Sequence, residues 1–279
     1  MTAKDKVTIL VDGDIFIYQA LAAAEKPIQW DEDLWTLHSS LDEATAIFTQ
    51  KLESAVEEVL EYVTSCTDYD IIIALSSPDG TNFRKDIYPD YKSNRKDKRS
   101  PLVRKALYDY VLNNYNTFSR PHLEADDVLG ILATSPYIVE SAHKVIVSSD
   151  KDFKTIPGHH YNMDKKEQFI ILPSESAYWH MYQTLTGDTA DGYPGCPGIG
   201  PKKAEALLPA PMFRDTPDEY YSKAWPIVLE AYKKAKLGEE FALTMARLAR
   251  ICQRDDYNFK EKAVLLWQPP ALLLLTQEE

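Results

Sequence analysis

The sequence predicts an α/β fold with a mainly parallel central sheet, flanking helices and a helical C-terminal region. Three apolar runs rich in β-branched residues, each ending in polar or acidic residues, have the pattern of buried parallel strands; they cover 7–14, 69–77 and 143–150. Apolar residues at helical spacing lie between these runs, and the strand signal fades in the last third of the chain. We therefore expect an α/β core over 1–173 and a helical region over 174–279.

The helices are predicted from apolar spacing and from start signals. Residues 41–63 carry apolar side chains at near-helical spacing, and Ser40 with Glu43 predicts a capping box at the start. This segment should form the crossover between the first two strands. The remaining helices are predicted at 101–115, 124–132, 174–185, 201–208 and 239–251.

Composition limits the class of protein. With 279 residues, 44% of them hydrophobic, the chain is long enough to bury a substantial core. It has no run of about 18 apolar residues and no signal-peptide pattern, so we expect no membrane segment and a cytoplasmic location, in the host if a phage encodes it. Cys66, Cys196 and Cys252 form no CxxC pair and predict neither disulfides nor a zinc site.

The charge is unevenly distributed along the chain. A formal net charge of −12 by itself disfavours a nucleic-acid partner, because phosphate binding needs a cationic surface. Residues 84–105, however, contain nine Lys or Arg and three Asp, which gives this segment a local charge of +6. The acidic remainder fits either an ordinary solvated surface or carboxylates that hold divalent cations.

Carboxylates gather where the carboxyl edge of the sheet should lie, which is the edge at which open α/β sheets bind ligands. They are Asp12 and Asp14 after the first strand, Asp150 and Asp152 after the third, Glu124, Asp126 and Asp127 at a helix start, and Asp188 and Asp191 in a GDTAD motif. One such pair is often only a helix cap. Four groups at one edge would repel one another unless cations lie between them.

The ligand types indicate which cation. Hard oxygen ligands without a His or Cys cluster favour magnesium or manganese over zinc. Two such ions about 4 Å apart are the usual clamp for in-line attack on a phosphate. The carboxylates therefore predict a metal-dependent reaction at phosphorus.

Four motifs occur in a fixed order: VDGD at 11–14, NFRKDIYPDYKSNR at 82–95, LEADDVLG with SSDKDF between 123 and 153, and GDTADGYPGCPGIGPKKA at 187–204. Together they resemble the flap endonuclease and 5′-to-3′ exonuclease family, which includes the 5′-nuclease domain of bacterial DNA polymerase I and stand-alone bacteriophage exonucleases. The resemblance implies a PIN-like 5′-nuclease core, a basic helical arch at about 84–115 and a helix-hairpin-helix element at about 187–208.

By the same resemblance, eight carboxylates hold two Mg²⁺ ions, which Mn²⁺ can replace. The first metal belongs to Asp12, Glu124 and Asp126, with Asp127 beside them, and the second to Asp150, Asp152, Asp188 and Asp191. The family has an Asp at the end of the second strand, where this chain has Ser76 and Ser77, with Asp79 slightly displaced. We expect a water in that position and a first metal held more loosely than the second.

Basic residues carry the expected DNA contacts. Arg84 and Lys92 are the implied catalytic cations, which hold the scissile phosphate and stabilise charge on its oxygens. The full set expected to bind DNA is Arg84, Lys85, Tyr91, Lys92, Arg95, Gly198, Gly200, Lys202 and Lys203. The last four lie in the helix-hairpin-helix segment, which binds duplex phosphates through backbone N–H groups and in the family also holds K⁺. A solvated basic helix and a plain glycine-rich loop are the simpler interpretations of these two segments.

The predicted function is a two-metal 5′ nuclease that hydrolyses phosphodiester bonds at the 5′ ends of duplex or branched DNA and releases 5′-phosphate products, in replication and primer removal. Action on RNA in hybrids stays open. We expect a monomer whose partner is DNA with a 5′ end. Two alternatives are a haloacid-dehalogenase-type phosphatase with Asp12 as the nucleophile and a non-catalytic DNA-binding module. Ile15 after the DxD disfavours the first alternative, and the retained carboxylates disfavour the second.

Overall fold

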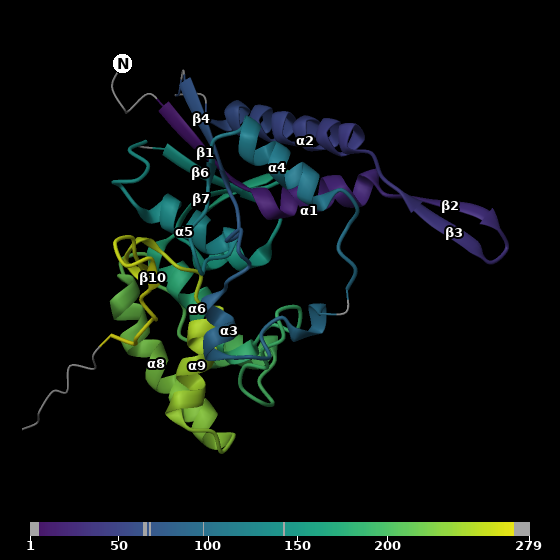
Figure 1. The fold of residues 1–279 in the computed structure, drawn as a ribbon. Coiled ribbons are helices and arrows are strands. Elements are labelled where there is room, and N and C mark those ends of the chain that lie inside the picture. Colours follow the sequence, from purple (N-terminus) through teal and green to yellow (C-terminus); the bar gives the residue numbers. More distant parts are fainter. Residues whose placement is uncertain (1–5, 64–65, 67, 97, 142, 271–279) are drawn as a thin grey trace, which may run out of the picture.

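The protein is built around one central sheet. The computed structural model describes residues 6–63, 66, 68–96, 98–141 and 143–270 (Figure 1). The six strands have the order β5-β4-β1-β6-β7-β8, and all neighbours are parallel except β7 and β8. The strands are β1 (Lys6–Asp12), β4 (Asp68–Ala74), β5 (Thr117–Phe118), β6 (His143–Ser148), β7 (Gly158–Asn162) and β8 (Glu167–Ile171). The predicted mainly parallel α/β fold is confirmed.

Helices cover both faces of the sheet. One face packs against α1 (Gly13–Ala24), α2 (Leu41–Tyr62) and α4 (Arg104–Asn114), and the other packs against α5 (Ala125–Thr134). Strand β1 is buried on both sides, because Val7, Ile9 and Val11 lie in the first cluster while Leu10 lies in the second. Its continuous apolar sequence follows from this double burial.

The start of α2 differs from the prediction in its cap. The helix begins at Leu41 as expected, but the Ser40 side chain makes no capping hydrogen bond. Glu43, the other half of the predicted capping box, accepts instead from Lys26 Nζ at 2.5 Å. The ion pair with a cation from the preceding hairpin replaces the local contact.

The basic arch is not a continuous helix. Helix α3 (Phe83–Ile87) and helix α4 are joined by residues 88–103, which we call the strap; its described residues contain one 3-10 turn, Ser93–Arg95, and no α-helix. Pro89 and Pro101 interrupt helical hydrogen bonding. Lys92 also has a left-handed backbone, with φ 55°, which an α-helix of L-residues does not contain.

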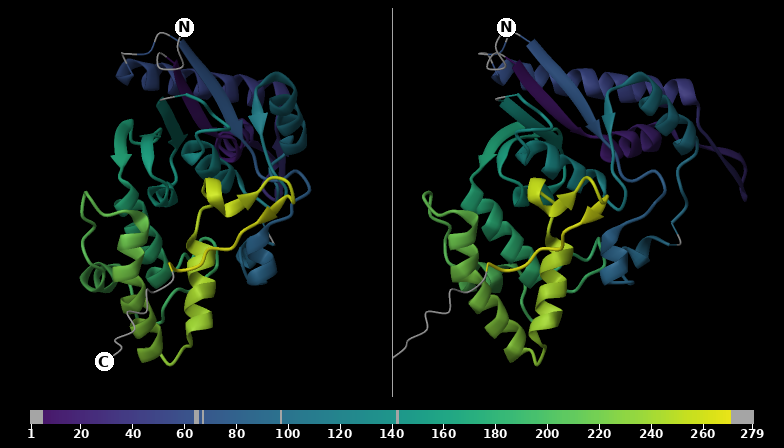
Figure 2. Two further views of the ribbon diagram at one scale, coloured as in Figure 1. Left: turned by 90° about the vertical axis from the view of Figure 1, so that its left-hand side faces the viewer. Right: turned by 60° about the vertical axis from the view of Figure 1, so that its left-hand side comes forward.

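A two-stranded hairpin projects from the body between α1 and α2 (Figures 1 and 2). It consists of β2 (Lys26–Asp31) and β3 (Leu34–His38), which pair only with each other. Trp30 and Trp35 keep 65% and 56% of their surface exposed. This arm carries the insertion for which the sequence indicated no role.

The C-terminal part is mainly helical and forms its own apolar cluster below the sheet (Figure 2). Its helices are α6 (Pro173–Thr186), α7 (Pro201–Leu207), α8 (Pro217–Lys234) and α9 (Glu239–Ala249), followed by a small hairpin of β9 (Tyr257–Asn258) and β10 (Ala263–Val264). Ile251, Cys252 and Tyr257 return to the α/β part and pack in the cluster around α5. Within the described ranges, no helix combines the length and apolarity needed to cross a membrane.

Candidate active site

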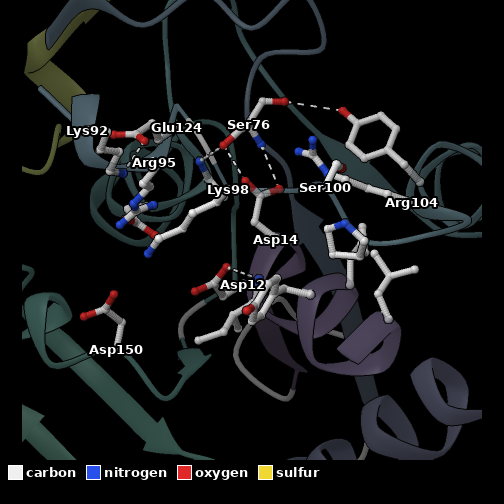
Figure 3. Close-up of a pocket in the computed structure, with 18 of the residues that line it drawn as sticks. Asp12, Asp14, Ser76, Lys92, Arg95, Lys98, Ser100, Arg104, Glu124 and Asp150 are labelled. Carbon is white, nitrogen blue, oxygen red and sulfur yellow. Dashed lines mark hydrogen bonds and ion pairs between the residues drawn. The ribbon is translucent and has the colours of Figure 1, made fainter. Parts of the chain in front are cut away.

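The strand ends and helix starts at one edge of the sheet form an acidic cavity of about 450 Å³ (Figure 3). Asp12 ends β1, Glu124 precedes α5, and Asp150 follows β6 by two residues. The carboxylates that line the cavity are Asp12, Asp14, Glu124, Asp126, Asp150 and Asp191. Five of the predicted metal ligands therefore share one cavity, and Asp14 joins them.

Asp12 and Asp14 are held by neighbouring polar groups. Asp12 caps α1 by accepting from Ile15 N, and its second oxygen accepts from Ser148 Oγ at 2.8 Å. Burial, with the nearby Asp14 charge, raises the pKa of Asp12 to about 7. Burial also raises the pKa of Asp14. Both carboxyls are therefore destabilised as anions in the absence of a cation.

The two carboxylates of the α5 start differ in their surroundings. Desolvation and the charge of Asp12 raise the pKa of Asp126 well above its ordinary value. Glu124 is also desolvated, but Lys92 and Arg84 outweigh this effect and hold its pKa at about 2. Glu124 forms ion pairs with Lys92 Nζ and, at 3.3 Å, with Arg84 Nη1. The start of α5 thus carries Glu124, whose charge is balanced by ion pairs, and close to it Asp126, which forms no ion pair within the described residues.

The second predicted group is more spread out. Asp152 accepts from Gln183 Nε2 at 2.5 Å, and burial with the Asp150 charge raises its pKa to about 7. Asp188 is buried, but a 3.0 Å bond from Lys151 Nζ and two backbone N–H groups keep its pKa low despite desolvation. A cavity of about 20 Å³ lined by Asp152, Asp126 and Asp191 joins this group to the first.

The strap supplies cations to the same cavity. Arg95 Nη2 lies 2.7 Å from Asp191 Oδ1, and Lys92 Nζ lies 3.6 Å from Asp191 Oδ2. Behind the strap, a second cavity of about 410 Å³ is lined by Lys85, Lys92, Arg95, Lys96 and Arg104. Lys92, Arg95 and Arg104 border both cavities. The strap cations Lys92 and Arg95 therefore lie between the acidic cavity and the second cavity.

Tyr91 is buried and does not present its ring to solvent. It keeps 3% exposure, stacks on Tyr193, and its hydroxyl lies 2.9 Å from both Glu124 Oε2 and Asp191 Oδ2. This geometry does not support the expected stacking on DNA. It makes Tyr91 a bridge between two carboxylates, a role that sequence reasoning did not anticipate because the tyrosine came from a basic, polar segment.

Arg84 and Asp127 form a buried pair instead of lining the cavity. All five guanidinium N–H groups are used: they point to Asp127, Glu124 and the carbonyls of Leu248 and Arg250. The two Asp127 oxygens also accept from Cys252 N and Glu124 N. The geometry therefore supports neither a direct phosphate contact by Arg84 nor a metal contact by Asp127.

The remaining predicted residues lie on the surface. Lys85, Lys202 and Lys203 are exposed, as are Gly198 and Gly200 in the loop between α6 and α7. Gly198 has a φ of 78°, which explains the glycine, and its carbonyl accepts from Lys203 Nζ at 2.8 Å. Lys202, Lys203 and the two glycines belong to one exposed helix-loop-helix surface.

Asp79 does not reach the cavity. Its carboxylate accepts from Ser77 Oγ, Thr81 Oγ1 and Thr81 N within its own turn, which lowers its pKa to about 2. The turn therefore folds back on itself. Ser76, in contrast, lines the cavity and contacts Asp14.

The donor set fits a hard divalent cation. The acidic cavity presents carboxylate oxygens, and no His or Cys lines it. Among the described residues, no three Asp, Glu, His or Cys side chains already have the spacing of a metal site. Lys92 forms an ion pair with Glu124, and Arg95 forms one with Asp191. The cavity therefore contains basic side chains as well as carboxylates.

Comparisons with known proteins point to one family. The model of the family described as "5′-3′ exonuclease, N-terminal resolvase-like domain" matches residues 7–177. An exonuclease of Escherichia phage T7 is 31% identical over 290 residues, which cover 95% of this chain and 94% of the relative. A flap endonuclease of Shewanella baltica is 30% identical over 205 residues, which cover 68% and 76%.

Solved structures of this kind of nuclease have a similar fold. The flap endonuclease of bacteriophage T5, in a pseudo-enzyme-product complex with DNA and metal ions, matches with a TM-score of 0.54 and 14% identity. The match covers 87% of this chain and 88% of that chain. At this identity it shows the shared fold.

Proposed function

The chain belongs to the 5′-3′ exonuclease family, which includes flap endonucleases, and we propose that it hydrolyses phosphodiester bonds at 5′ ends of duplex or branched DNA with two magnesium ions. The observation that carries this proposal is the single cavity with six carboxylates, bordered by the cations of the strap. Asp12, Glu124 and Asp126 would hold the first metal, and Asp150, Asp152, Asp188 and Asp191 the second.

The bound cations would lower the pKa of a water and neutralise charge on the scissile phosphate. Asp12, Asp126 and Asp152 support such binding, because each has a raised pKa that a nearby cation would reverse. Gln183 holds Asp152 and Ser148 holds Asp12, so both carboxylates are oriented before substrate arrives. The products are DNA fragments that carry a 5′-phosphate.

Lys92 and Arg95 would position the scissile phosphate. Both side chains line the acidic cavity and also the second cavity behind the strap. In the acidic cavity they pair with Glu124 and Asp191. Lys92 is 15% exposed and Arg95 48% exposed in their side chains. The enclosed ammonium suits stabilisation of developing charge, and the more open guanidinium suits capture of the incoming strand.

The end of the loop between α6 and α7, together with the first turn of α7, would hold the duplex. Exposed Lys202 and Lys203 and the glycine backbone offer sequence-independent phosphate contacts. We extend the proposal to K⁺ at this loop and to a monomeric enzyme. The division into a nuclease core at 1–173 and a helical region at 174–279 stays part of the same proposal.

A cleavage assay tests the proposal. A 5′-labelled duplex and a flapped duplex are incubated with the protein and either magnesium or EDTA, and we expect short 5′-phosphate fragments only with magnesium. Release of inorganic phosphate alone would indicate the phosphatase alternative, which the comparisons do not support. Binding without cleavage in magnesium and in manganese would contradict the nuclease.

A further inference from the structure

Asp14, in the first turn of α1, contacts Ser76, which follows the end of β4. Strands β1 and β4 pair in parallel up to Asp12 opposite Ala74. Beyond this pair the first chain turns into α1, whose first turn carries Asp14, and the second continues to Ser76. Ser76 Oγ donates to Asp14 Oδ2 at 2.5 Å, and Ser76 N lies 3.3 Å from Asp14 Oδ1 (Figure 3). The Asp14 carboxylate therefore lies directly over the end of β4.

Ser76 also connects Asp14 to the start of α5. Its hydroxyl oxygen accepts from Ala125 N at 3.1 Å while its hydrogen points to Asp14. Ala125 lies between Glu124 and Asp126. One serine thus fixes the Asp14 carboxylate next to the helix start that carries two proposed ligands of the first metal.

Asp14 forms no direct ion pair within the described residues. Glu124, Asp188 and Asp191 each form an ion pair with Lys or Arg, whereas Asp14, within the described residues, accepts hydrogen bonds only from Ser76. Arg104 lines the same cavity and contributes a nearby positive charge, but it forms no ion pair with Asp14. A desolvated carboxylate without a direct ion pair is stabilised when a cation binds beside it. Asp14 lines the same cavity as Asp12 and Asp126.

We propose that Asp14 is a further ligand of the first metal and supplies, from the start of α1, the carboxylate that Ser76 does not supply from the end of β4. This inference rests on the proposed function. It replaces the expectation that a water fills the Ser76 position and that the first metal is held more loosely: the carboxylate has moved across the β1–β4 pair, so the number of negative charges is kept.

A purely structural role for Asp14 makes a different prediction. If Asp14 only accepts hydrogen bonds from Ser76, then Asp14→Asn keeps an acceptor oxygen in place and should leave the Mn²⁺ affinity almost unchanged. If Asp14 binds the metal, the same substitution removes a charge and a ligand without a change in volume. Asparagine therefore separates the two roles, and its near-identical shape favours correct folding.

The experiment measures Mn²⁺ binding by calorimetry without DNA. The variants are Asp14→Asn, Ser76→Asp with Asp14→Ser, and the control Asp164→Asn, an exposed aspartate in the β7–β8 turn. We expect Asp14→Asn to weaken one of two sites by roughly 10- to 100-fold, the range seen when groups around a metal are removed. The exchanged double variant should recover most of this affinity because its carboxylate returns to the same place from β4.

Unchanged affinities at both sites in Asp14→Asn would overturn the proposal, and so would a weak site that the exchanged double variant fails to restore. Circular dichroism checks that each variant is folded, and Mn²⁺ should raise the melting temperature of Asp14→Asn less than that of the wild type. Failure of the wild type to bind Mn²⁺ would contradict the proposed function itself. Two Mn²⁺ sites of equal affinity in the wild type and in Asp14→Asn would contradict only the role of Asp14.

Discussion

At the scale of single residues, the environment of each carboxylate decides its role. Asp126 and Asp127 are adjacent in sequence, yet Asp126 faces the acidic cavity while Asp127 has 0% exposure and pairs with Arg84. A helix turns by about 100° per residue, so neighbours point to different surroundings. The LEADD motif therefore combines ligands with a structural anchor.

Asp126 and Asp150 test the position of the active site. Asp126→Ala and Asp150→Ala should each lower the turnover of a flapped duplex by more than about 100-fold, because even groups that only support metal ligands contribute roughly 10- to 100-fold. Duplex binding measured in calcium should persist. Asp164→Ala, on the exposed turn, provides the matched control. Near-wild-type turnover in either variant would show that the active site does not lie at these carboxylates.

At the scale of elements, the strap and the first turn of α7 should separate catalysis from binding. Lys92→Ala should lower kcat more than it raises KM, because the enclosed ammonium acts on charge that develops during the reaction. Lys202→Ala and Lys203→Ala should weaken duplex binding for every sequence and reduce the salt slope by about one per lost phosphate contact. Steady-state kinetics measure the effect of Lys92→Ala, and salt titrations of duplex binding measure the effects of Lys202→Ala and Lys203→Ala. If all three substitutions changed only the affinity for DNA, the assignment of Lys92 to catalysis would be contradicted.

The Arg84–Asp127 pair joins three elements: α3, the start of α5 and the segment after α9. Removal of one partner leaves a buried charge without compensation, so Asp127→Ala should cost about 3–5 kcal/mol of the free energy of unfolding. The double variant Arg84→Met with Asp127→Leu should lose less free energy of unfolding than the sum of the losses in the single variants Arg84→Met and Asp127→Leu. Urea unfolding measures the cycle.

The exposed Lys105–Asp109 pair is the control for this prediction. Its side chains are 87% and 47% exposed, and its loss should cost no more than about 0.5 kcal/mol. Costs of similar size for the two pairs would show that the buried pair does not anchor the three elements.

At the scale of the whole molecule, the acidic cavity should couple stability to pH. The pKa of Asp12 is about 7 in the folded protein against an ordinary value of 3.8, so its contribution to stability is present below about pH 4 and lost as pH rises through about 7. The buried His160 and His180 have lowered pKa values and act in the opposite direction below about pH 6.5. The difference between wild type and Asp12→Asn isolates the aspartate.

In EDTA, the wild type should therefore lose stability relative to Asp12→Asn between about pH 4 and pH 8, by an amount on the order of 4 kcal/mol. Magnesium should remove most of the difference, because the cation stabilises the ionised carboxylate. Thermal and urea unfolding across this range measure the effect. A pH-independent difference would show that Asp12 ionises normally in the metal-free protein.

The sequence by itself determined the parallel α/β fold, the nuclease family and five of the six carboxylates that line the acidic cavity. Strand burial produces apolar runs, and metal sites require particular side chains, so both leave signals in the order of residues. The end of β1 with Asp12 and the start of α5 after Glu124 lie within two residues of where the pattern predicts them. The antiparallel strand β8 and the long helix α8, with Pro226 inside it, left no comparable signal.

Only the tertiary structure decided which polar residues meet. Arg84 and Tyr91 look like DNA-binding residues in a basic segment, but contacts with Asp127, Leu248 and Asp191, all distant in sequence, bury both side chains. Asp14 likewise meets Ser76 only because β1 and β4 pair in one register. Hydrogen bonds between residues 62 to 166 positions apart depend on the register of strands and the docking of helices, which no local pattern encodes.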